Sequence, residues 1–152
     1  MRIHASSVAR DGDAVLLLGP PGSGKSDLVL RLIRDGWRLV ADDQVDLRAG
    51  EAGLCASPPD ALRGMLEVRG LGLFRDLAVA APAPLRLVAR LVPRAEIPRL
   101  PAPERWADAG VALPVIRLDP FEASATAKLA LALEAALGRA PQVAGAFLQA
   151  GA

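Results

Sequence analysis

The clearest chemistry in this 152-residue chain belongs to one glycine-rich segment. Residues 19–26 read Gly-Pro-Pro-Gly-Ser-Gly-Lys-Ser and fit the pattern G-x-x-x-x-G-K-[ST] in full. The glycines let backbone N–H groups turn toward phosphate oxygens, Lys25 adds a compact positive charge, and the Ser26 hydroxyl is a ligand for Mg²⁺. We therefore predict a nucleotide-phosphate site made by Gly19, Pro20, Pro21, Gly22, Ser23, Gly24, Lys25 and Ser26.

Two adjacent carboxylates, Asp42 and Asp43, form the second candidate group. They follow the apolar run 37–41, and ligand sites of open α/β sheets gather at the carboxyl ends of strands. One carboxylate can sit near the Mg²⁺ while the other accepts a proton from an attacking hydroxyl. We expect the pair to lie beside the phosphate site if the strands before the two segments are neighbours.

The elements around these groups follow from the apolar pattern. Residues 14–18 are continuously apolar, which favours a strand buried on both faces. Residues 25–35 carry an apolar stripe at helical spacing, and Gly36 follows as a C-terminal cap. The pattern predicts a strand, a glycine loop, a helix, and then a strand over 37–41 that ends at the carboxylates.

The rest of the chain adds further elements around this unit. We predict one domain over residues 1–152, of α/β class, with a mixed central sheet flanked by helices. Residues 66–74 are expected to be a strand end joined to a functional loop, and the proline-rich stretch 93–103 to be an extended surface segment. The other expected elements are strands over 3–8, 77–81, 85–92 and 111–118, a short helix over 61–65, a helix over 123–137, and a loosely ordered tail over 139–152.

Composition narrows the function classes. The formal net charge is +1, which argues against a strongly electrostatic nucleic-acid or membrane-surface binder. No apolar run approaches the length that spans a bilayer, and the single cysteine fits a reducing cytoplasm. The chain has no asparagine, which excludes the guanine-binding Asn-Lys-x-Asp motif of GTPases.

Three blocks of sequence together resemble one family. They are residues 19–26, residues 35–45 and the block 64–73, which reads Gly-Met-Leu-Glu-Val-Arg-Gly-Leu-Gly-Leu. The chain resembles the catalytic domain of bacterial HPr(Ser) kinase/phosphorylase, and the third block is the most specific part of the resemblance. The resemblance implies the P-loop fold shared by HPr kinase and PEP carboxykinase, and phosphoryl transfer from ATP, with Mg²⁺, to a serine of the phosphocarrier HPr. It also implies a cytoplasmic homo-oligomer, a hexamer in this family.

The resemblance assigns roles by matching position. Asp43 would be the base in the forward direction and the proton donor in the reverse direction, with Asp42 beside it. Lys25 and His4 would lie against the phosphates. The implied catalytic residues are Asp43, Lys25, His4, Arg99 and Asp42, Arg99 being matched to a mobile loop, and the implied Mg²⁺ ligands are Ser26 and Glu67.

The sequence also departs from the family pattern. It starts almost at the catalytic domain, so we expect no separate N-terminal domain and a short form like those of alphaproteobacteria. Pro20 and Pro21 stiffen the phosphate loop and remove two N–H donors. The Pro-Gly-Arg segment that the family uses in dephosphorylation is replaced by residues 118–121, Leu-Asp-Pro-Phe, so we expect the kinase reaction and leave the reverse phosphorolysis open.

Two other functions fit the same residues. A small-molecule kinase of the P-loop class would use the same loop and carboxylates, with Arg94, Arg99 and Arg105 imitating an arginine-rich lid. A regulatory module that binds ATP without catalysis would need the loop but not a second carboxylate. Asp43 therefore discriminates catalysis from binding alone.

Overall fold

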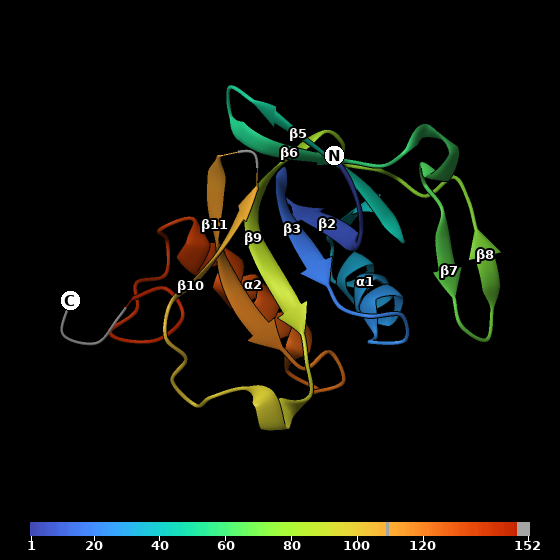
Figure 1. The fold of residues 1–152 in the computed structure, drawn as a ribbon. Helices are drawn as coiled ribbons and strands as arrows, with labels where there is room; N and C mark the ends of the chain where they lie inside the picture. Colours follow the sequence, from blue (N-terminus) through green and yellow to red (C-terminus); the bar gives the residue numbers. More distant parts are fainter. Residues whose placement is uncertain (109, 149–152) are drawn as a thin grey trace.

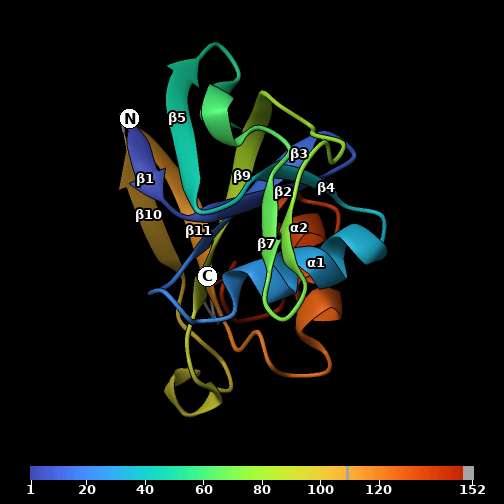
Figure 2. The same cartoon turned by 90° about the vertical axis from the view of Figure 1, so that its right-hand side faces the viewer.

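The computed structural model describes residues 1–108 and 110–148, and Figures 1 and 2 show their arrangement. The helices are α1 (Lys25–Arg34), α2 (Ala125–Ala136) and the short 3₁₀ helices η1 (Asp60–Leu62) and η2 (Arg94–Glu96). The strands are β1 (Arg2–His4), β2 (Ser6–Arg10), β3 (Asp13–Leu18), β4 (Arg38–Ala41), β5 (Gln44–Gly50), β6 (Gly53–Ser57), β7 (Leu66–Val68), β8 (Gly72–Phe74), β9 (Ala83–Leu91), β10 (Glu104–Asp108) and β11 (Val111–Leu118).

Nine of these strands form one mixed sheet around β9. β9 pairs in parallel with β3 on one side and with β11 on the other, while its first residues pair antiparallel with β6. The sheet continues from β3 through β2 to β4, and from β6 through β5 to β1. β10 pairs with β11. The prediction of an α/β fold with a mixed central sheet is confirmed.

The central strand β3 explains why its sequence is apolar throughout. Val15 and Leu17 join the core under α1 and α2, whereas Ala14 and Leu16 join a second core on the opposite face. Neither face meets water, so no polar residue interrupts the run. Both helices contribute buried side chains to the first core, including Leu28 and Leu32 of α1 and Leu129 and Leu133 of α2.

The second face is closed by the sheet itself. In Figure 1 the β5–β6 hairpin crosses above β2, β3 and β9, and its residues Val45, Leu47 and Leu54 fill the second core. The sheet curls over itself because two segments of the chain bend sharply. The chain passes from β1 to β2 at Ala5, and from β4 to β5 at Asp42 and Asp43, so both paths change direction at the same place.

Several predicted elements differ in the structure. The single strand expected over 3–8 is split at Ala5, because its two halves pair with different strands, β5 and β4. Residues 77–81 form only an isolated bridge between Val79 and Leu39. Residues 66–74 form the two-stranded β7–β8 hairpin. The helices predicted over 25–35 and 123–137 are confirmed with small shifts of their ends, and part of the expected loose tail, 149–152, lies outside the described residues.

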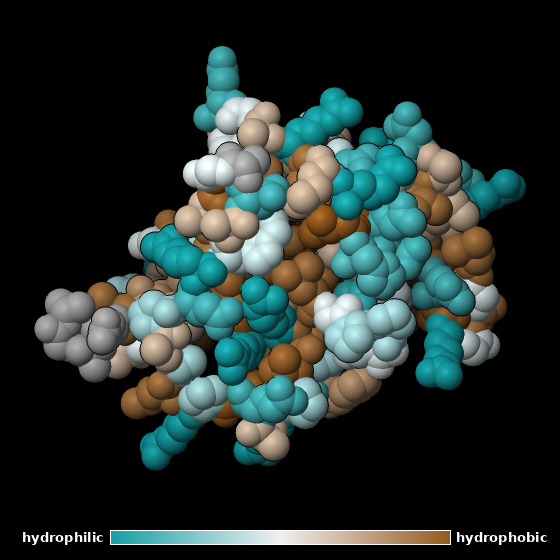
Figure 3. All heavy atoms as spheres, in the orientation of Figure 1, coloured by the Kyte–Doolittle hydropathy of each residue, from teal (hydrophilic) through white to brown (hydrophobic). Residues whose placement is uncertain are grey.

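The surface adds two facts. Figure 3 shows apolar side chains at its right-hand edge, where Figure 1 places the β7–β8 hairpin, and Leu71, Leu73 and Phe74 of this hairpin are exposed. Among the described residues, no helix has both the length and the apolar character that crossing a membrane requires.

Candidate active site

The phosphate loop joins two buried elements that fix its ends. β3 enters it at Leu18, and α1 begins at Lys25, so residues 19–24 must turn the chain within six positions. Gly22 and Gly24 have φ values of 80° and 98°, a region that side chains with a Cβ rarely adopt. Ser23 N donates to Pro20 O at 3.1 Å and closes the turn. The two glycines are therefore required by the shape of the loop.

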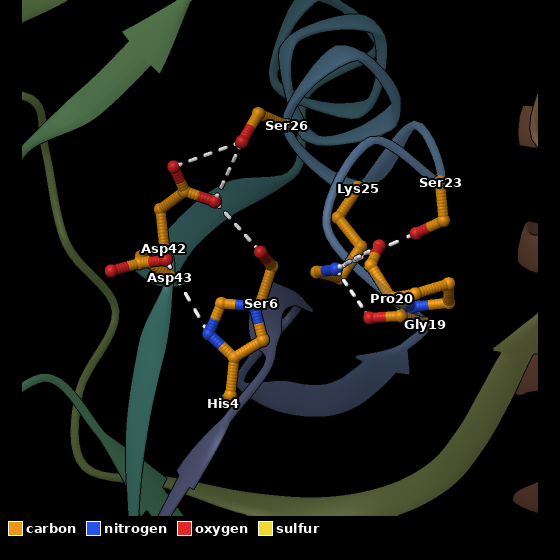
Figure 4. Close-up of polar contacts among 9 residues, drawn as sticks. All are labelled: His4, Ser6, Gly19, Pro20, Ser23, Lys25, Ser26, Asp42 and Asp43. Carbon is orange, nitrogen blue, oxygen red and sulfur yellow. Dashed lines mark hydrogen bonds and ion pairs between the residues drawn. The ribbon is translucent and has the colours of Figure 1, made fainter.

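Lys25 is folded back over its own loop. Its Nζ donates to Gly19 O at 2.5 Å, Pro20 O at 3.0 Å and Ser23 Oγ at 3.5 Å (Figure 4). Burial lowers the pKa of the Lys25 ammonium group, and the nearby carboxylates of Asp42 and Asp43 oppose that shift. The positive charge of Lys25 is largely shielded from water and has only neutral hydrogen-bond partners. It would therefore attract a phosphate anion more strongly than a fully solvated lysine would.

Asp42 points from the end of β4 toward the start of α1. It is 7% exposed, and both of its carboxylate oxygens accept from Ser26 Oγ at 3.1 Å. Its Oδ1 also accepts from the buried hydroxyl of Ser6 at 2.7 Å. The carboxylate and the loop serine thus form one hydrogen-bonded unit, as Figure 4 shows.

Asp43 points the other way. Gln44 N donates to Asp42 O at 2.8 Å across Asp43, whose φ is 70°, which is the pattern of a γ-turn. The turn separates the two neighbouring side chains, and Asp43 Oδ1 lies 3.4 Å from His4 Nδ1 with both side chains exposed. Aspartate tolerates the left-handed region better than most residues do. The backbone therefore gives the two carboxylates different surroundings.

These groups share one cavity of about 610 Å³. Glu67 and Arg69 reach it from β7 and the turn after β7, and Phe121 reaches it from the segment before α2. No group of three or more His, Cys, Asp or Glu side chains that would hold a metal by themselves occurs in the described ranges. Mg²⁺ nevertheless fits the oxygen donors here, because this ion is commonly held by one or two carboxylates together with phosphates and water.

The structure brings most of the predicted site residues together. The predicted residues that line this cavity are His4, Pro21, Gly22, Gly24, Lys25, Ser26, Asp42, Asp43 and Glu67. Gly19, Pro20 and Ser23 belong to the same loop and contact Lys25. Arg99 is placed elsewhere, at a second cavity of about 620 Å³ between residues 98–104, α2 and residues 140–147. The structure therefore does not bring Arg99 to the other candidates.

Ser6 is a site residue that sequence reasoning missed. It lines the cavity and binds Asp42, but serine carries no distinctive signal at an apolar strand position. The available signal is that Ser6 and Ser7 stand together between the apolar residues Ala5 and Val8. Two polar residues in succession there mean that a hydroxyl must find a partner on each face of the sheet.

Comparison with known proteins agrees with the resemblance in sequence. The family model described as the HPr Serine kinase C-terminal domain matches residues 1–81, which include the phosphate loop, the carboxylate pair and the β7–β8 hairpin. The HPr kinase/phosphorylase of Cupriavidus metallidurans is 41% identical over 135 residues, covering 83% of this chain and 41% of that protein. The one from Burkholderia lata is 40% identical over 144 residues, covering 89% and 44% respectively.

A third relative matches a shorter part of the chain at a higher sequence identity. The HPr kinase/phosphorylase of Clostridium tetani is 49% identical over 73 residues, which is 48% of this chain and 24% of that protein. The chain thus spans only 24% to 44% of the length of these relatives. The solved structure of the Hpr(Ser) kinase/phosphatase from Coxiella burnetii matches with a TM-score of 0.70 and 27% identity, over 91% of this chain and 88% of that one. The predicted fold is confirmed by this match.

Proposed function

Because the chain belongs to the HPr serine kinase C-terminal domain family, we propose that it transfers the γ-phosphoryl group of ATP to a serine of the phosphocarrier HPr. The observation that carries the proposal is the opposite orientation of two adjacent carboxylates. Asp42 is buried against Ser26 of the phosphate loop, and Asp43 is exposed beside His4. A protein that only binds ATP has no need of the second, exposed carboxylate.

The phosphates of ATP fit the loop and its lysine. Gly22, Gly24 and the start of α1 offer backbone N–H groups, and Lys25 exchanges its carbonyl partners for phosphate oxygens. Mg²⁺, when bound, would neutralise negative charge that develops on the phosphates. Ser26 and Asp42 would hold it on one side, and Glu67 faces the same cavity from β7.

Asp43 is placed for the proton transfer. Its carboxylate is 63% exposed at the mouth of the cavity, where a serine hydroxyl on another protein can reach it. As the serine oxygen forms its bond to the γ-phosphorus, the bond from that phosphorus to the leaving oxygen of ADP breaks, and Asp43 takes the hydroxyl proton. His4, 3.4 Å from Asp43, would orient the carboxylate, and it lines the same cavity as Lys25.

Family membership also supports the wider setting of the reaction. We propose that the chain acts in the cytoplasm and assembles as a homo-oligomer, a hexamer by the resemblance. The kinase direction is the one proposed here. Pro120 and Phe121 stand in the segment where the family pattern has a glycine and an arginine for dephosphorylation.

The test is transfer of labelled phosphate from ATP to purified HPr, followed by identification of the labelled amino acid. We expect label on a serine of HPr with the wild-type protein, and none with Lys25→Ala or Asp43→Asn. Absence of label on HPr, with ATP still bound, would contradict the proposal. Turnover of ATP with a small acceptor would then favour a small-molecule kinase, and unchanged behaviour of Asp43→Asn would favour a regulatory module.

A further inference from the structure

A large aromatic side chain stands exposed at the rim of the phosphate-binding cavity. Phe121 is 70% exposed and belongs to the segment between β11 and α2, which Figure 1 draws in orange beside the loop that precedes α1. Phenylalanine has no polar group to place in water, so this exposure costs hydrophobic free energy. The same ring lines the cavity that contains Lys25 and Ser26.

The backbone of Phe121 is held in place by several contacts. Its N–H donates to Asp119 Oδ1 at 2.9 Å, and the other oxygen of Asp119 accepts from Arg94 N at 3.2 Å. The carbonyl of the preceding residue, Pro120, accepts a hydrogen bond from Arg31 Nη2 on α1. These contacts tie the segment to both η2 and α1, so the ring is positioned before any ligand arrives.

The ring also lies directly against the phosphate loop. A Cβ added to Gly24 would stand 3.0 Å from Phe121 Cζ and 3.0 Å from Pro120 Cγ. Gly24 is the residue before Lys25, so the aromatic ring adjoins the part of the loop that leads into α1. Phe121 is also the only phenylalanine, tryptophan or tyrosine among the described residues that line this cavity.

We propose that Phe121 forms one face of a nucleobase subsite, on which the base of the bound nucleotide stacks. This inference rests on the proposed function in that the ligand is a nucleotide held at residues 19–26. Stacking of a base on an aromatic ring needs no hydrogen-bond donor or acceptor on the protein, which suits a phenylalanine. Loss of such a ring weakens binding by about 5- to 100-fold.

The test compares two ligands that share the triphosphate but differ in the base. Binding of ATP and of inorganic tripolyphosphate, each with Mg²⁺, is measured by titration calorimetry on the wild-type protein, Phe121→Ala and Phe121→Trp. We expect Phe121→Ala to weaken ATP binding about 5- to 100-fold and to leave tripolyphosphate binding unchanged. Phe121→Trp should retain ATP binding, because the larger ring also offers a stacking face.

The matched control is Phe74→Ala, which removes an exposed aromatic ring on β8 that does not line the cavity. It should change neither affinity. Equal weakening of ATP and tripolyphosphate by Phe121→Ala would overturn the proposal, since the ring would then only support the loop. Unchanged ATP binding, or a wild-type protein that binds neither ligand, would overturn it as well. Loss of HPr labelling while ATP binding is retained would count against the proposed function alone.

Discussion

Ser6 Oγ donates a 2.7 Å hydrogen bond to Oδ1 of Asp42, although the two residues are 36 positions apart in the sequence. The next residue, Ser7, is equally buried but faces the opposite side of the sheet, where its hydroxyl donates to Val15 O at 2.8 Å. Two adjacent buried serines thus have different partners. Of the two serines, only Ser6 donates a hydrogen bond to a carboxylate that we place near Mg²⁺.

This difference can be measured with one pair of variants. Ser6→Ala leaves Asp42 without one of its hydrogen bonds, and supports of this kind typically change metal affinity about 10- to 100-fold. We expect it to raise by that factor the Mg²⁺ concentration needed for half-maximal ATP binding. Ser7→Ala should lower the free energy of unfolding by about 1 kcal/mol and leave the Mg²⁺ dependence unchanged. Equal Mg²⁺ dependence in the two variants would contradict the role of Ser6.

The two carboxylates should separate metal binding from catalysis. Asp42→Asn removes a charged oxygen next to Ser26, so we expect Mg²⁺ to strengthen ATP binding much less in this variant than in the wild type. Asp43→Asn keeps a residue that tolerates the positive φ of this turn, so the fold and Mg²⁺-dependent ATP binding should be retained. Its rate of transfer to HPr should fall by about 10²- to 10⁴-fold. Calorimetry and a transfer assay on both variants check this, and a reversed pattern would exchange the two roles.

Replacing the two glycines of the loop that have a positive φ should lower the free energy of unfolding by different amounts. Gly22→Ala meets open space, so it pays only for a positive φ, about 1–2 kcal/mol of unfolding free energy. Gly24→Ala meets the same strain and also crowds Phe121 and Pro120, so its loss should be larger. Urea unfolding of both variants measures the difference. In the double variant Gly24→Ala/Phe121→Ala the loss should be smaller than the sum of the two single losses, and strict additivity would show that the ring does not crowd this position.

An ion pair between β1 and β5 gives a pH-dependent prediction. Arg2 and Asp46 lie opposite each other on β1 and β5, and the hydrogen bond from Arg2 holds the pKa of the Asp46 carboxyl below its usual value. A carboxyl whose folded pKa is lowered stabilises the fold at pH values above its unfolded pKa, and that stabilisation is lost as pH falls through the folded value. Because the pair is exposed, the effect should be small.

The wild-type protein should therefore be slightly more stable than Asp46→Asn at pH 7, and the difference should vanish once the pH has fallen through the lowered pKa of Asp46. Chemical unfolding at several pH values measures it. A difference that persists at low pH would assign the effect to packing instead of charge.

The parts of the fold that the sequence predicted are those governed by local rules. The continuous apolar run of β3, the stripe of α1 and the glycine pattern between them each follow from residues within a few positions of one another. The prediction that the carboxylates lie beside the loop depends on β3 and β4 being neighbours, and they are not, because β2 lies between them. Asp42 nevertheless contacts Ser26, since β3 and β4 each pair antiparallel with β2 and so end at the same side of the sheet. What remained open was which carboxylate faces the loop, since the γ-turn at Asp43 decides it.

The missed elements depend on distant pairing. Residues 44–57 contain Gln44, Arg48 and two glycines, a weak strand pattern, yet they form β5 and β6 because β1 and β9 flank them on both sides. β10 was missed for the same reason, since Glu104, Arg105 and Asp108 are not typical of a strand. Conversely, residues 77–81 are apolar enough for a strand but find only one bridge partner.

The bend at Ala5 links the assembly of the site to the pairing of strands that are far apart in the sequence. Ala5 N donates to Asp43 O at 3.2 Å, at the corner where β1 meets β2 and β4 meets β5. The phosphate loop and α1 can form from contacts local in sequence, but the carboxylates reach them only after strands far apart in the chain have paired. Local opening at this corner would therefore abolish the proposed phosphoryl transfer, while the proposed binding of phosphates by the loop would persist. The exchange rate of the Ala5 amide proton should report how often the molecule enters that state.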